Sequence, residues 1–364
     1  MWLVATAAQD MSGAASLPLD RDLFVSPPPR LSFEQVAALL ERAYGIHPHD
    51  ITALASERDA NFRIDTDGGR FTLKVSNAAE PPAAVDLNSC VLNHINERAP
   101  DFPAPKIVRT VGGGFNTIVT DGTGKPSNVR LLTYLDGLPL GDAEISSPLV
   151  RSIGSALGRL SCILDDFDHP HKNIPILWDS TNVHRLAPLL DNVPDKGRRD
   201  VLKRHLRHFE THVRPTLGKR RRHIIHNDAN PGNVLVNVRG TASFAGIFDF
   251  GDIVYAPAIN ELAVAATYLL ARCDDVVSLI SDLVSGYAGH AACTSEDLCI
   301  VPDLMTARFL TTILITHWRA DLFPGNADYI LRNNPGAWAG LERMDRMDRA
   351  GLTPQGIQQL TGQS

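Results

Sequence analysis

The sequence predicts an α+β protein with two lobes, a small antiparallel-sheet lobe followed by a larger and mainly helical lobe. Alternating apolar residues, typical of strands, fill much of the first third of the 364-residue chain, and helical spacing dominates after residue 142. A break rich in Gly and Pro, GLPLGD (137–142), separates the two patterns. A chain of this length is also too long for one ordinary core, which favours two lobes.

The smaller lobe is expected to cover residues 30–136 and to begin with a helix. Ser32 lies in position to cap SFEQVAALLERAY, in which apolar residues recur three and four apart and Glu34 falls in the first turn. Residues 1–29 are of mixed composition and run into SPPPR, so a loose N-terminal arm is expected.

The next segment predicts a small antiparallel sheet. NFRIDT and RFTLKVS alternate apolar and polar residues and flank DGG, a turn sequence typical of β-hairpins. Helical spacing follows at 83–99. The other strands expected in this lobe are 51–56, 103–111, 115–121 and 128–135.

The larger lobe is expected to cover residues 137–350, with 351–364 as a C-terminal tail. Most of it has helical spacing, and a ligand is expected in the cleft between the lobes. Helices are predicted at 147–164, at 196–217 and from 260 to about 345, and short strands at 223–228, 233–238 and 241–252.

Composition excludes several classes of protein. Apolar residues make up 44% and charged residues 21% of a chain with net charge −6, so a globular protein that binds neither nucleic acid nor an anionic membrane is expected. The five cysteines include no CxxC pair, which disfavours a disulfide framework or a zinc site. MWLVATAAQD is a poor signal peptide, so a cytoplasmic location is expected. The sequence does not indicate an oligomeric state.

Two short motifs carry the chemistry. HNDANPGN (226–233) places Asp228 and Asn233 five residues apart, and Asp249 follows sixteen residues later in IFDFGD. These match the H-x-D-x-x-x-x-N and D-F-G patterns of kinases, and Lys74 in RFTLKVS resembles the strand lysine that contacts nucleotide phosphates. Carboxylate and amide oxygens suit Mg²⁺, which phosphoryl transfer requires. The sequence therefore predicts a metal–nucleotide site in a protein-kinase-like fold.

Each residue also has a plainer explanation. Asn, Asp and Pro are common in turns, and exposed lysines are common in strands. The order Lys74, Asp228, Asn233, Asp249 favours the site over these explanations. His226 is expected to be a hydrogen-bonded support that does not titrate in the reaction, and Glu261 a buried structural partner beneath the loop.

The chain resembles the aminoglycoside phosphotransferase-like superfamily of small-molecule kinases, and within it most closely the hydroxylysine kinase group. The resemblance covers roughly residues 30–345. The motifs that carry it are HNDANPGNVLV, GIFDFGDIVYAPAINELAVAATYLL and LFPGNADYILRNNPGAWAGLERM.

The resemblance implies a role for individual residues. Asp228 would orient the acceptor hydroxyl, Asn233 and Asp249 would hold Mg²⁺, and Lys74 would contact the phosphates of ATP or GTP. The loop SERDANF (56–62), with Asn61 and Phe62, would cover those phosphates. The segment 132–135, with Thr133 and Leu135, would be the hinge that holds the base.

The chain departs from the family pattern in three places. SERDANF stands where protein kinases have GxGxxG, and Asn227 stands where Gly is common between His and Asp. The acidic helix residue that would pair with Lys74 is not evident. Asn88 occupies its likeliest position, and Asp86 is the weaker candidate for the partner.

The acceptor is expected to be a small amino alcohol or hydroxy amino acid, cationic or zwitterionic, with hydroxylysine first. Asp252 could take an ammonium group, and Trp318 with Arg319 could bind a carboxylated headgroup. Alternatively, Asp252 caps a turn and Trp318 belongs to the core. The C-terminal GLTPQGIQQLTGQS is not acidic, which disfavours a polycationic aminoglycoside.

The sequence also bears on three other functions. An aminoglycoside or other small-alcohol kinase of the same superfamily is the nearest alternative. A non-catalytic nucleotide-binding module is disfavoured because Lys74, Asp228 and Asp249 are all present. A protein kinase is disfavoured because no long activation loop follows DFG.

Overall fold

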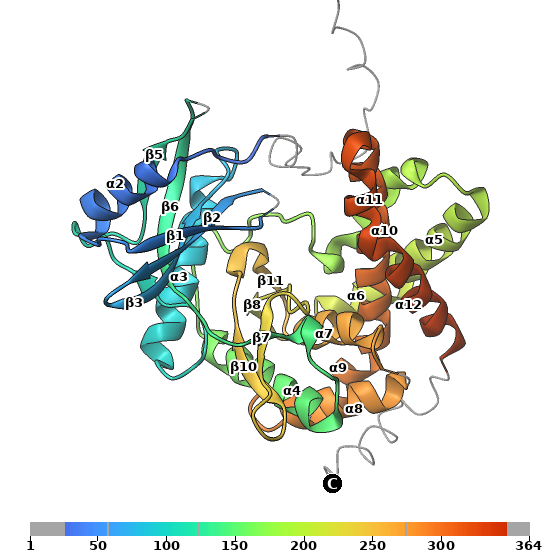
Figure 1. The fold of residues 1–364 in the computed structure, drawn as a ribbon. Helices are drawn as coiled ribbons and strands as arrows, with labels where there is room; N and C mark the ends of the chain where they lie inside the picture. The colour runs from blue at the N-terminus through green and yellow to red at the C-terminus, as the bar shows by residue number, and fades with distance from the viewer. Residues whose placement is uncertain (1–25, 57, 123, 274, 348–364) are drawn as a thin grey trace, which may run out of the picture.

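The computed structural model describes residues 26–347 except 57, 123 and 274, and it shows two lobes that differ in secondary structure (Figure 1). A strand-rich N-terminal lobe precedes a mainly helical C-terminal lobe, so the predicted α+β, kinase-like fold is confirmed. Most of the expected N-terminal arm and the whole of the expected C-terminal tail lie outside the described residues.

The N-terminal lobe is one antiparallel sheet with two helices, one before its first strand and one between β3 and β4 in the chain. The strand order is β1-β2-β3-β6-β4, and β5 pairs with β6. The predicted hairpin is present, with Thr66 opposite Gly69 at the turn and Asn61 opposite Lys74. The strands are β1 (Asp50–Leu54), β2 (Ala60–Thr66), β3 (Gly69–Val75), β4 (Ile107–Val108), β5 (Thr117–Thr120) and β6 (Pro126–Thr133).

The two helices of this lobe have different tasks. α2 (Phe33–Tyr44) starts at Ser32, whose side chain forms a capping box with Gln35, and it packs its apolar face on the sheet. α3 (Pro82–Arg98) instead belongs to the main hydrophobic core through residues such as Val91 and Ile95. α3 therefore ties the sheet to the C-terminal lobe.

The C-terminal lobe is built from helices around two small sheets. β7 (Leu138–Pro139), β9 (Val234–Asn237) and β10 (Ser243–Ile247) form one sheet, and β8 (Arg222–Ile225) pairs with β11 (Val254–Pro257) in the other. The helices are α4 (Ser147–Leu164), α5 (Lys196–His208), α6 (Arg214–Leu217), α7 (Asn260–Leu270), α8 (Val276–Tyr287), α9 (Ser295–Cys299), α10 (Val301–Leu322), α11 (Ala327–Ile330) and α12 (Asn334–Arg346).

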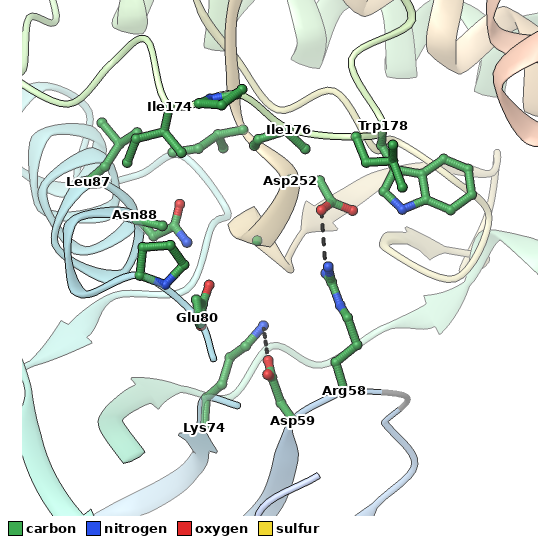
Figure 2. Close-up of a pocket in the computed structure, with 16 residues that line it drawn as sticks. Arg58, Asp59, Lys74, Glu80, Leu87, Asn88, Ile174, Ile176, Trp178 and Asp252 are labelled. Carbon is green, nitrogen blue, oxygen red and sulfur yellow. Dashed lines mark hydrogen bonds and ion pairs between the residues drawn. The ribbon is translucent and has the colours of Figure 1, made fainter. Parts of the chain in front are cut away.

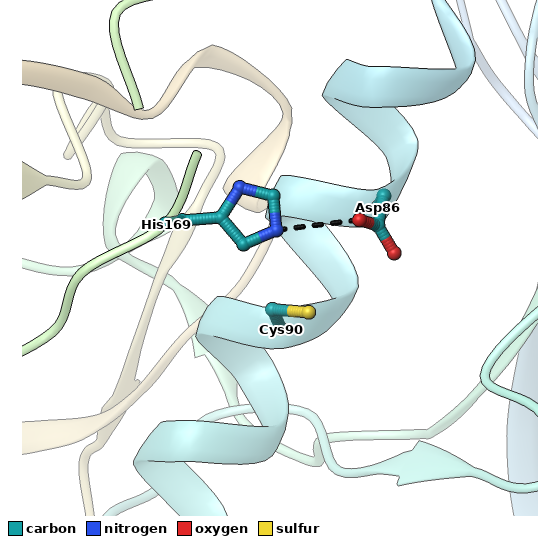
Figure 3. A group of neighbouring side chains, drawn as sticks. All are labelled: Asp86, Cys90 and His169. Carbon is teal, nitrogen blue, oxygen red and sulfur yellow. Dashed lines mark ion pairs between the residues drawn. The ribbon is translucent and has the colours of Figure 1, made fainter. Parts of the chain in front are cut away.

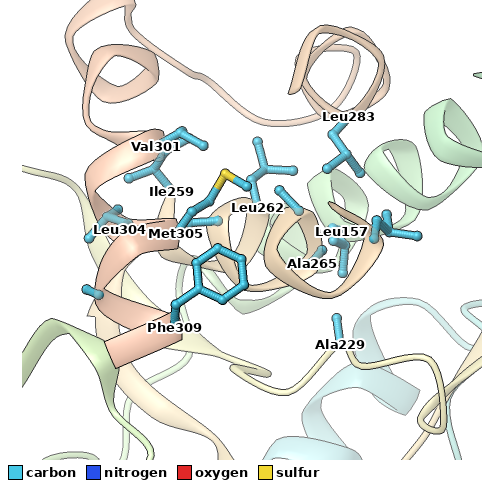
Figure 4. Close-up of a cluster of buried hydrophobic side chains, with 14 of the residues drawn as sticks. Leu157, Ala229, Ile259, Leu262, Ala265, Leu283, Val301, Leu304, Met305 and Phe309 are labelled. Carbon is cyan, nitrogen blue, oxygen red and sulfur yellow. The ribbon is translucent and has the colours of Figure 1, made fainter. Parts of the chain in front are cut away.

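A large apolar cluster lies under the HNDANPGN and DFG motifs. Leu262 and Ala265 of α7 lie between α10 residues such as Met305 and the α4–α8 pair, and Ala229 of the HNDANPGN loop joins the same cluster (Figure 4). α4 and α8 approach so closely at Gly154 that a Cβ there would overlap the backbone of Leu283, and only glycine fits. The loop 226–233 therefore rests on a rigid base.

Several elements differ from the sequence-based expectation. The helix expected at 196–217 is interrupted by a π-helical turn at Phe209–Val213, just before Pro215, which has no backbone N–H to donate. The strand expected at 103–111 is reduced to β4. The 3₁₀ segment Ser180–Asn192 and the strand β11 were not expected.

Among the described helices, none combines the length and the apolar character that would allow it to cross a membrane.

Candidate active site

The HNDANPGN loop is anchored from below by a buried carboxylate. β8 and β9 flank the loop, and Asn227 adopts a left-handed conformation with φ 64°. The carboxylate of Glu261 on α7 accepts the backbone N–H of His226 at 2.5 Å and that of Asn227 at 3.3 Å. Burial raises the pKa of Glu261 to about 7. The predicted role of Glu261 as a structural partner beneath the loop is confirmed by these contacts.

His226 fixes the loop against the DFG segment. Its Nε2 lies 3.1 Å from the carbonyl oxygen of Phe248, and its Nδ1 accepts the N–H of Asp228 at 3.2 Å. Its ring also contacts Phe250 edge to face. Burial lowers the pKa of His226 to about 4, so the ring is neutral near pH 7. The expectation of a hydrogen-bonded, non-titrating support agrees with this geometry.

Asp228 is held in place at both carboxylate oxygens. Its Oδ2 accepts hydrogen bonds from Asn233 at 2.8 Å and Asn230 at 2.9 Å. Its Oδ1 accepts from Arg308 at 3.1 Å and from the hydroxyl of Tyr268 at 3.2 Å. Burial raises the pKa of Asp228, and the Arg308 guanidinium opposes that rise. The carboxylate thus has a fixed orientation and an environment that favours accepting a proton.

Arg308 and Tyr268 are site residues that the sequence reasoning missed. Arg308 is 1% exposed and also donates to the carbonyl of Trp178 at 2.8 Å and to the hydroxyl of Tyr268 at 2.9 Å. A sequence signal existed, because Arg308 is the one charged residue in the apolar stretch LMTARFLTTILI (304–315) of α10. A buried charge in such a stretch requires a partner.

Asn233 and Asp249 are brought together by the β9–β10 pairing. Val234 lies opposite Ile247, and the N–H of Phe248 donates to the carbonyl of Asn233 at 3.0 Å. Asp249 itself adopts a left-handed conformation with φ 61°, which is uncommon outside glycine, and its carboxylate lies beside the Lys74 ammonium.

The donor atoms at this junction suit a hard divalent cation. Asn233 uses its Nδ2 to bind Asp228, which leaves its carbonyl oxygen as the candidate ligand beside the Asp249 carboxylate. One carboxylate and one amide oxygen, completed by phosphate and water, is a typical Mg²⁺ set. Asn233 and Asp249 could therefore hold the metal of a metal–nucleotide complex.

Lys74 projects from β3 into the same cleft. Its ammonium lies 2.8 Å from Asp249 and 3.2 Å from Asp59. Burial opposes the charge on Lys74, but Asp249 and Asp59 together hold its pKa above the ordinary value. Lys74 in turn holds the pKa of Asp249 below the ordinary carboxyl value. A permanent cation therefore lies beside the candidate metal ligand.

Asp86, the weaker candidate for the partner of Lys74, is wrong. Asp86 lies on the exposed face of α3, where it pairs with His169 at 3.3 Å next to Cys90 (Figure 3). Asp59, which precedes β2, takes the place beside Lys74 and also accepts the N–H of Asn77 at 3.1 Å. The hairpin register explains this, since Ala60 opposite Val75 places Asp59 next to the end of β3.

The residues expected to bind the nucleotide fall into two groups. Asn61 shares the Lys74 face of the hairpin, and its Oδ1 is buried with no hydrogen-bond partner among the described residues. Phe62 points to the opposite face, where it packs against α2 and makes an edge contact with Phe33. The side chain of Phe62 therefore belongs to the core, and its expected role in covering phosphates is corrected.

The segment 132–135 connects the lobes. β6 ends at Thr133, and β7 begins at Leu138 in a sheet of the C-terminal lobe. The N–H of Thr133 donates to the carbonyl of Lys106 at 2.9 Å, and the hydroxyl of Thr133 accepts the N–H of Lys106 at 2.9 Å. Leu135 lies close to Gly246 of β10. The backbone of this segment is thus positioned between the two lobes.

The three residues expected to bind the acceptor have different positions. Asp252 lies in the cleft and accepts from Arg58 at 3.4 Å. Trp318 and Arg319 lie on α10 ten and eleven residues beyond Arg308, so Arg319 is about 16 Å further along the helix axis. Burial and the nearby Arg332 lower the pKa of Arg319. Trp318 and Arg319 therefore lie remote from Asp228, and their expected role in binding the acceptor is corrected.

A cleft with an empty volume of about 790 Å³ lies between the N-terminal lobe and the C-terminal lobe (Figure 2). It runs from Lys74 and Gly251 to the start of α3 and to the segment 174–178 of the C-terminal lobe. Arg58, Asp59, Glu80, Asn88 and Asp252 line it, together with the ring of Trp178. The cleft therefore offers both positively and negatively charged side chains to a polar ligand.

The sequence and fold were compared with known proteins. "Hydroxylysine kinase" of Mus musculus is 25% identical over 342 residues, which cover 88% of this chain and 90% of that protein. "Hydroxylysine kinase" of Bos taurus is 26% identical over 345 residues, covering 88% and 91%.

Solved structures with the same fold include an amicoumacin kinase complexed with AMP-PNP and Ca²⁺. That structure has a TM-score of 0.67 at 17% identity and covers 91% of this chain and 98% of its own. A microcompartment-associated aminopropanol kinase has a TM-score of 0.62 at 15% identity, covering 88% and 100%. The model of the phosphotransferase enzyme family matches residues 50–293, more than half of the chain. The chain therefore belongs to the phosphotransferase enzyme family.

Proposed function

We propose that the protein transfers the terminal phosphate of a magnesium–nucleotide complex to a hydroxyl of a small amino alcohol or hydroxy amino acid, with hydroxylysine the first candidate. One observation carries the proposal. Three separate segments meet: Asn233 binds Asp228 at 2.8 Å, the N–H of Phe248 next to Asp249 donates to the carbonyl of Asn233, and Asp249 lies 2.8 Å from Lys74. This connected set of a carboxylate, two candidate metal ligands and a cation is the set of groups that phosphoryl transfer uses.

Each residue has a distinct task in this reaction. Asp228 accepts or orients the proton of the attacking hydroxyl, and its four hydrogen bonds hold the carboxylate for that purpose. Lys74 binds the phosphates and releases Asp249 to the metal, because phosphate oxygens compete with that carboxylate for the ammonium. Asn233 both orients Asp228 and offers its carbonyl oxygen to the metal.

Mg²⁺, when bound, would neutralise charge that develops on the phosphate oxygens. Asn233 and Asp249 are the residues that would hold it. The donor is ATP or GTP, with Asn61 near the phosphates and the backbone of Thr133 and Leu135 at the base. Residues 30–136 and 137–350 would then be the two lobes that meet at the hinge.

The choice of acceptor rests on the curated relatives and on the charges of the cleft. Two of them carry the name hydroxylysine kinase and match 88% of this chain. Asp252 lies in the cleft as a candidate contact for an ammonium group, although Arg58 already pairs with it. The odd number of cysteines, five, with no CxxC pair fits a reducing compartment, so a cytoplasmic location is proposed.

An acceptor screen tests the proposal. Nucleoside diphosphate release is measured with hydroxylysine, homoserine, choline, ethanolamine, 1-amino-2-propanol and kanamycin, each with ATP and with GTP, and with Mg²⁺ or excess chelator. We expect the highest kcat/KM with hydroxylysine, and no turnover in chelator. A preference for kanamycin over every amino alcohol would contradict the acceptor class. Transfer to a protein acceptor alone would contradict a small-molecule kinase.

A further inference from the structure

The start of α3 and the segment before it form one end of the cleft, where Glu80 and Asn88 face inward (Figure 2). The acids and cations of the cleft are otherwise paired, Arg58 with Asp252 at 3.4 Å and Lys74 with Asp59 at 3.2 Å. Within the described part of the chain, Glu80 has no ion-pair partner, and its buried Oε2 accepts no hydrogen bond. Glu80 is thus an acid of the cleft that forms no salt bridge with the described residues, although the charge of Arg58 acts on it.

Asn88 is a second incomplete polar group at the same end. It is 2% exposed, and its buried Nδ2 donates to no partner among the described residues. A buried donor or acceptor without a partner costs roughly 1–3 kcal/mol, so natural proteins seldom keep one without a use. Two such groups, one acceptor and one donor, line the same cavity.

The opposite wall of this pocket is close to the catalytic carboxylate. The carbonyl of Trp178 accepts from Arg308 at 2.8 Å, and Arg308 in turn binds Asp228 at 3.1 Å. The Trp178 ring lies beside the Arg308 guanidinium, with 5.5 Å between the ring centroid and the guanidinium carbon. Lys74 and Gly251 form the wall toward the phosphates. A molecule in the pocket is therefore flanked by the phosphate side and the Asp228 side.

We infer that this pocket holds the phosphate acceptor. Glu80 binds an ammonium group of that acceptor, and Asn88 donates a hydrogen bond to an oxygen of the same molecule. Leu87, Ile174 and Ile176 contribute apolar surface that suits a short methylene chain. The class of ligand is a small aliphatic amino alcohol that carries a positive charge. The inference rests on the proposed phosphotransfer and assigns the residues that select its acceptor.

A competing role for Glu80 leads to a different kinetic result. Glu80 lines the same cleft as Lys74, and it could pair with that lysine once Asp249 has bound a metal. In that case Glu80 would serve the nucleotide and not the acceptor. The KM values of the two substrates distinguish these roles.

The test compares Glu80→Gln with the parent protein on hydroxylysine, Nε-acetylhydroxylysine and Nα-acetylhydroxylysine. Glu80→Gln keeps the shape of the side chain and removes its charge, and Glu80→Asp keeps the charge. Glu97→Gln is the matched control, because Glu97 is an exposed acid near the other end of α3. Titration of L-lysine, which lacks the reacting hydroxyl, into each protein measures binding without turnover.

We expect Glu80→Gln to raise the KM for hydroxylysine about 10- to 100-fold and to weaken lysine binding similarly, with the nucleotide KM unchanged. The effect should vanish for the derivative whose acetylated amine is the one that Glu80 binds. Glu80→Asp should fall between, and Glu97→Gln should match the parent.

Equal losses on all three acceptors, or a change confined to the nucleotide KM, would overturn the inference. So would a parent protein that uses alcohols lacking an amine as well as it uses amines. Failure of the proposed function has another signature, in which the parent binds nucleotide but transfers phosphate to no alcohol.

Discussion

The two faces of the cleft are stabilised in different ways. The catalytic-loop face consists of loop 226–233 with Glu261, Tyr268 and Arg308. His226, Asn227, Glu261 and Arg308 are buried, and hydrogen bonds from backbone and side chains fix the groups of this face. The ion-pair face, formed by Arg58, Asp59, Lys74, Asp249 and Asp252, consists of charges that pair with one another. Its Asp249 side chain is 45% exposed.

This difference separates a part of the site that is already organised from a part that exchanges partners. The hydrogen bonds of the catalytic-loop face need no substrate, so Asp228 has its orientation before the reaction begins. The ion pairs of the other face compete with the charges that a nucleotide and its metal would bring. Changes in the first face should therefore affect the rate of transfer, and changes in the second should affect binding.

The largest expected effect comes from removing the catalytic carboxylate. Asp228→Ala should lower kcat by about a thousandfold or more, since a positioned acid–base group contributes roughly 10²–10⁴ and the orientation of the hydroxyl is lost as well. Nucleotide affinity should change little, because Lys74 and Asp249 remain. The measurements are single-turnover transfer and equilibrium titration of nucleotide.

A folded Asp228→Ala protein that fails to bind magnesium–nucleotide would show that Asp228 belongs functionally to the ion-pair face. Such a result would contradict the division of the site into a face that controls the rate and a face that controls binding.

A smaller effect is expected from Arg308, which acts through Asp228. Arg308→Met removes the hydrogen bonds to Asp228, Tyr268 and Trp178 and should lower kcat about 10- to 100-fold with the nucleotide KM unchanged. Arg308→Lys keeps the charge but loses the forked geometry, so it should recover only part of the rate. Steady-state kinetics and thermal unfolding test this together.

A loss of stability is expected in Arg308→Met as well, because a buried carboxylate would be left without its cation. If the folded variant keeps the parent kcat, Arg308 has a purely structural role, and Asn230, Asn233 and Tyr268 suffice to orient Asp228.

The sequence predicted the parts of the site that lie close together in the chain. Asp228 and Asn233 share one loop, and Asp249 follows after one hairpin, so their spacing alone brings them together. The β2–β3 hairpin was predicted for the same reason. Local patterns suffice where strands adjacent in the chain also pair in space.

The sequence failed where distant segments meet. Arg308 reaches Asp228 across 80 residues, and neither motif signals that contact. Asn88 holds the family position of the acid that pairs with Lys74, and Asp86 was the weaker candidate. The helical phase of α3 turns Asp86 outward and Asn88 inward. Arg319 was chosen for its chemistry alone, and the length of α10 separates it from the cleft. Each error concerns which part of a helix meets the site, either its face or its position along the axis, and only tertiary packing decides that.

The smallest effect concerns the pH dependence of stability and sharpens the comparison for the catalytic-loop face. Burial lowers the pKa of His226 from 6.5 to about 4, so between these values the unfolded chain binds a proton that the folded protein does not. The stabilisation is fully present above pH 6.5 and is lost as pH falls toward 4. Its size is at most about 3 kcal/mol. Glu261 acts in the opposite direction, because burial raises its pKa to about 7.

A comparison with His226→Gln isolates this contribution, since Glu261 and the other histidines are present in both proteins. The free energy of unfolding is measured by urea denaturation at intervals from pH 8 to pH 4.5. Between pH 6.5 and 4.5 the parent should lose stability relative to His226→Gln, and above pH 7.5 the difference between the two should be constant. A constant difference over the whole range would mean that the imidazole takes up its proton equally in the folded and unfolded chains. The loop would then tolerate a charge at His226, and the catalytic-loop face would be less rigidly organised than its hydrogen bonds indicate.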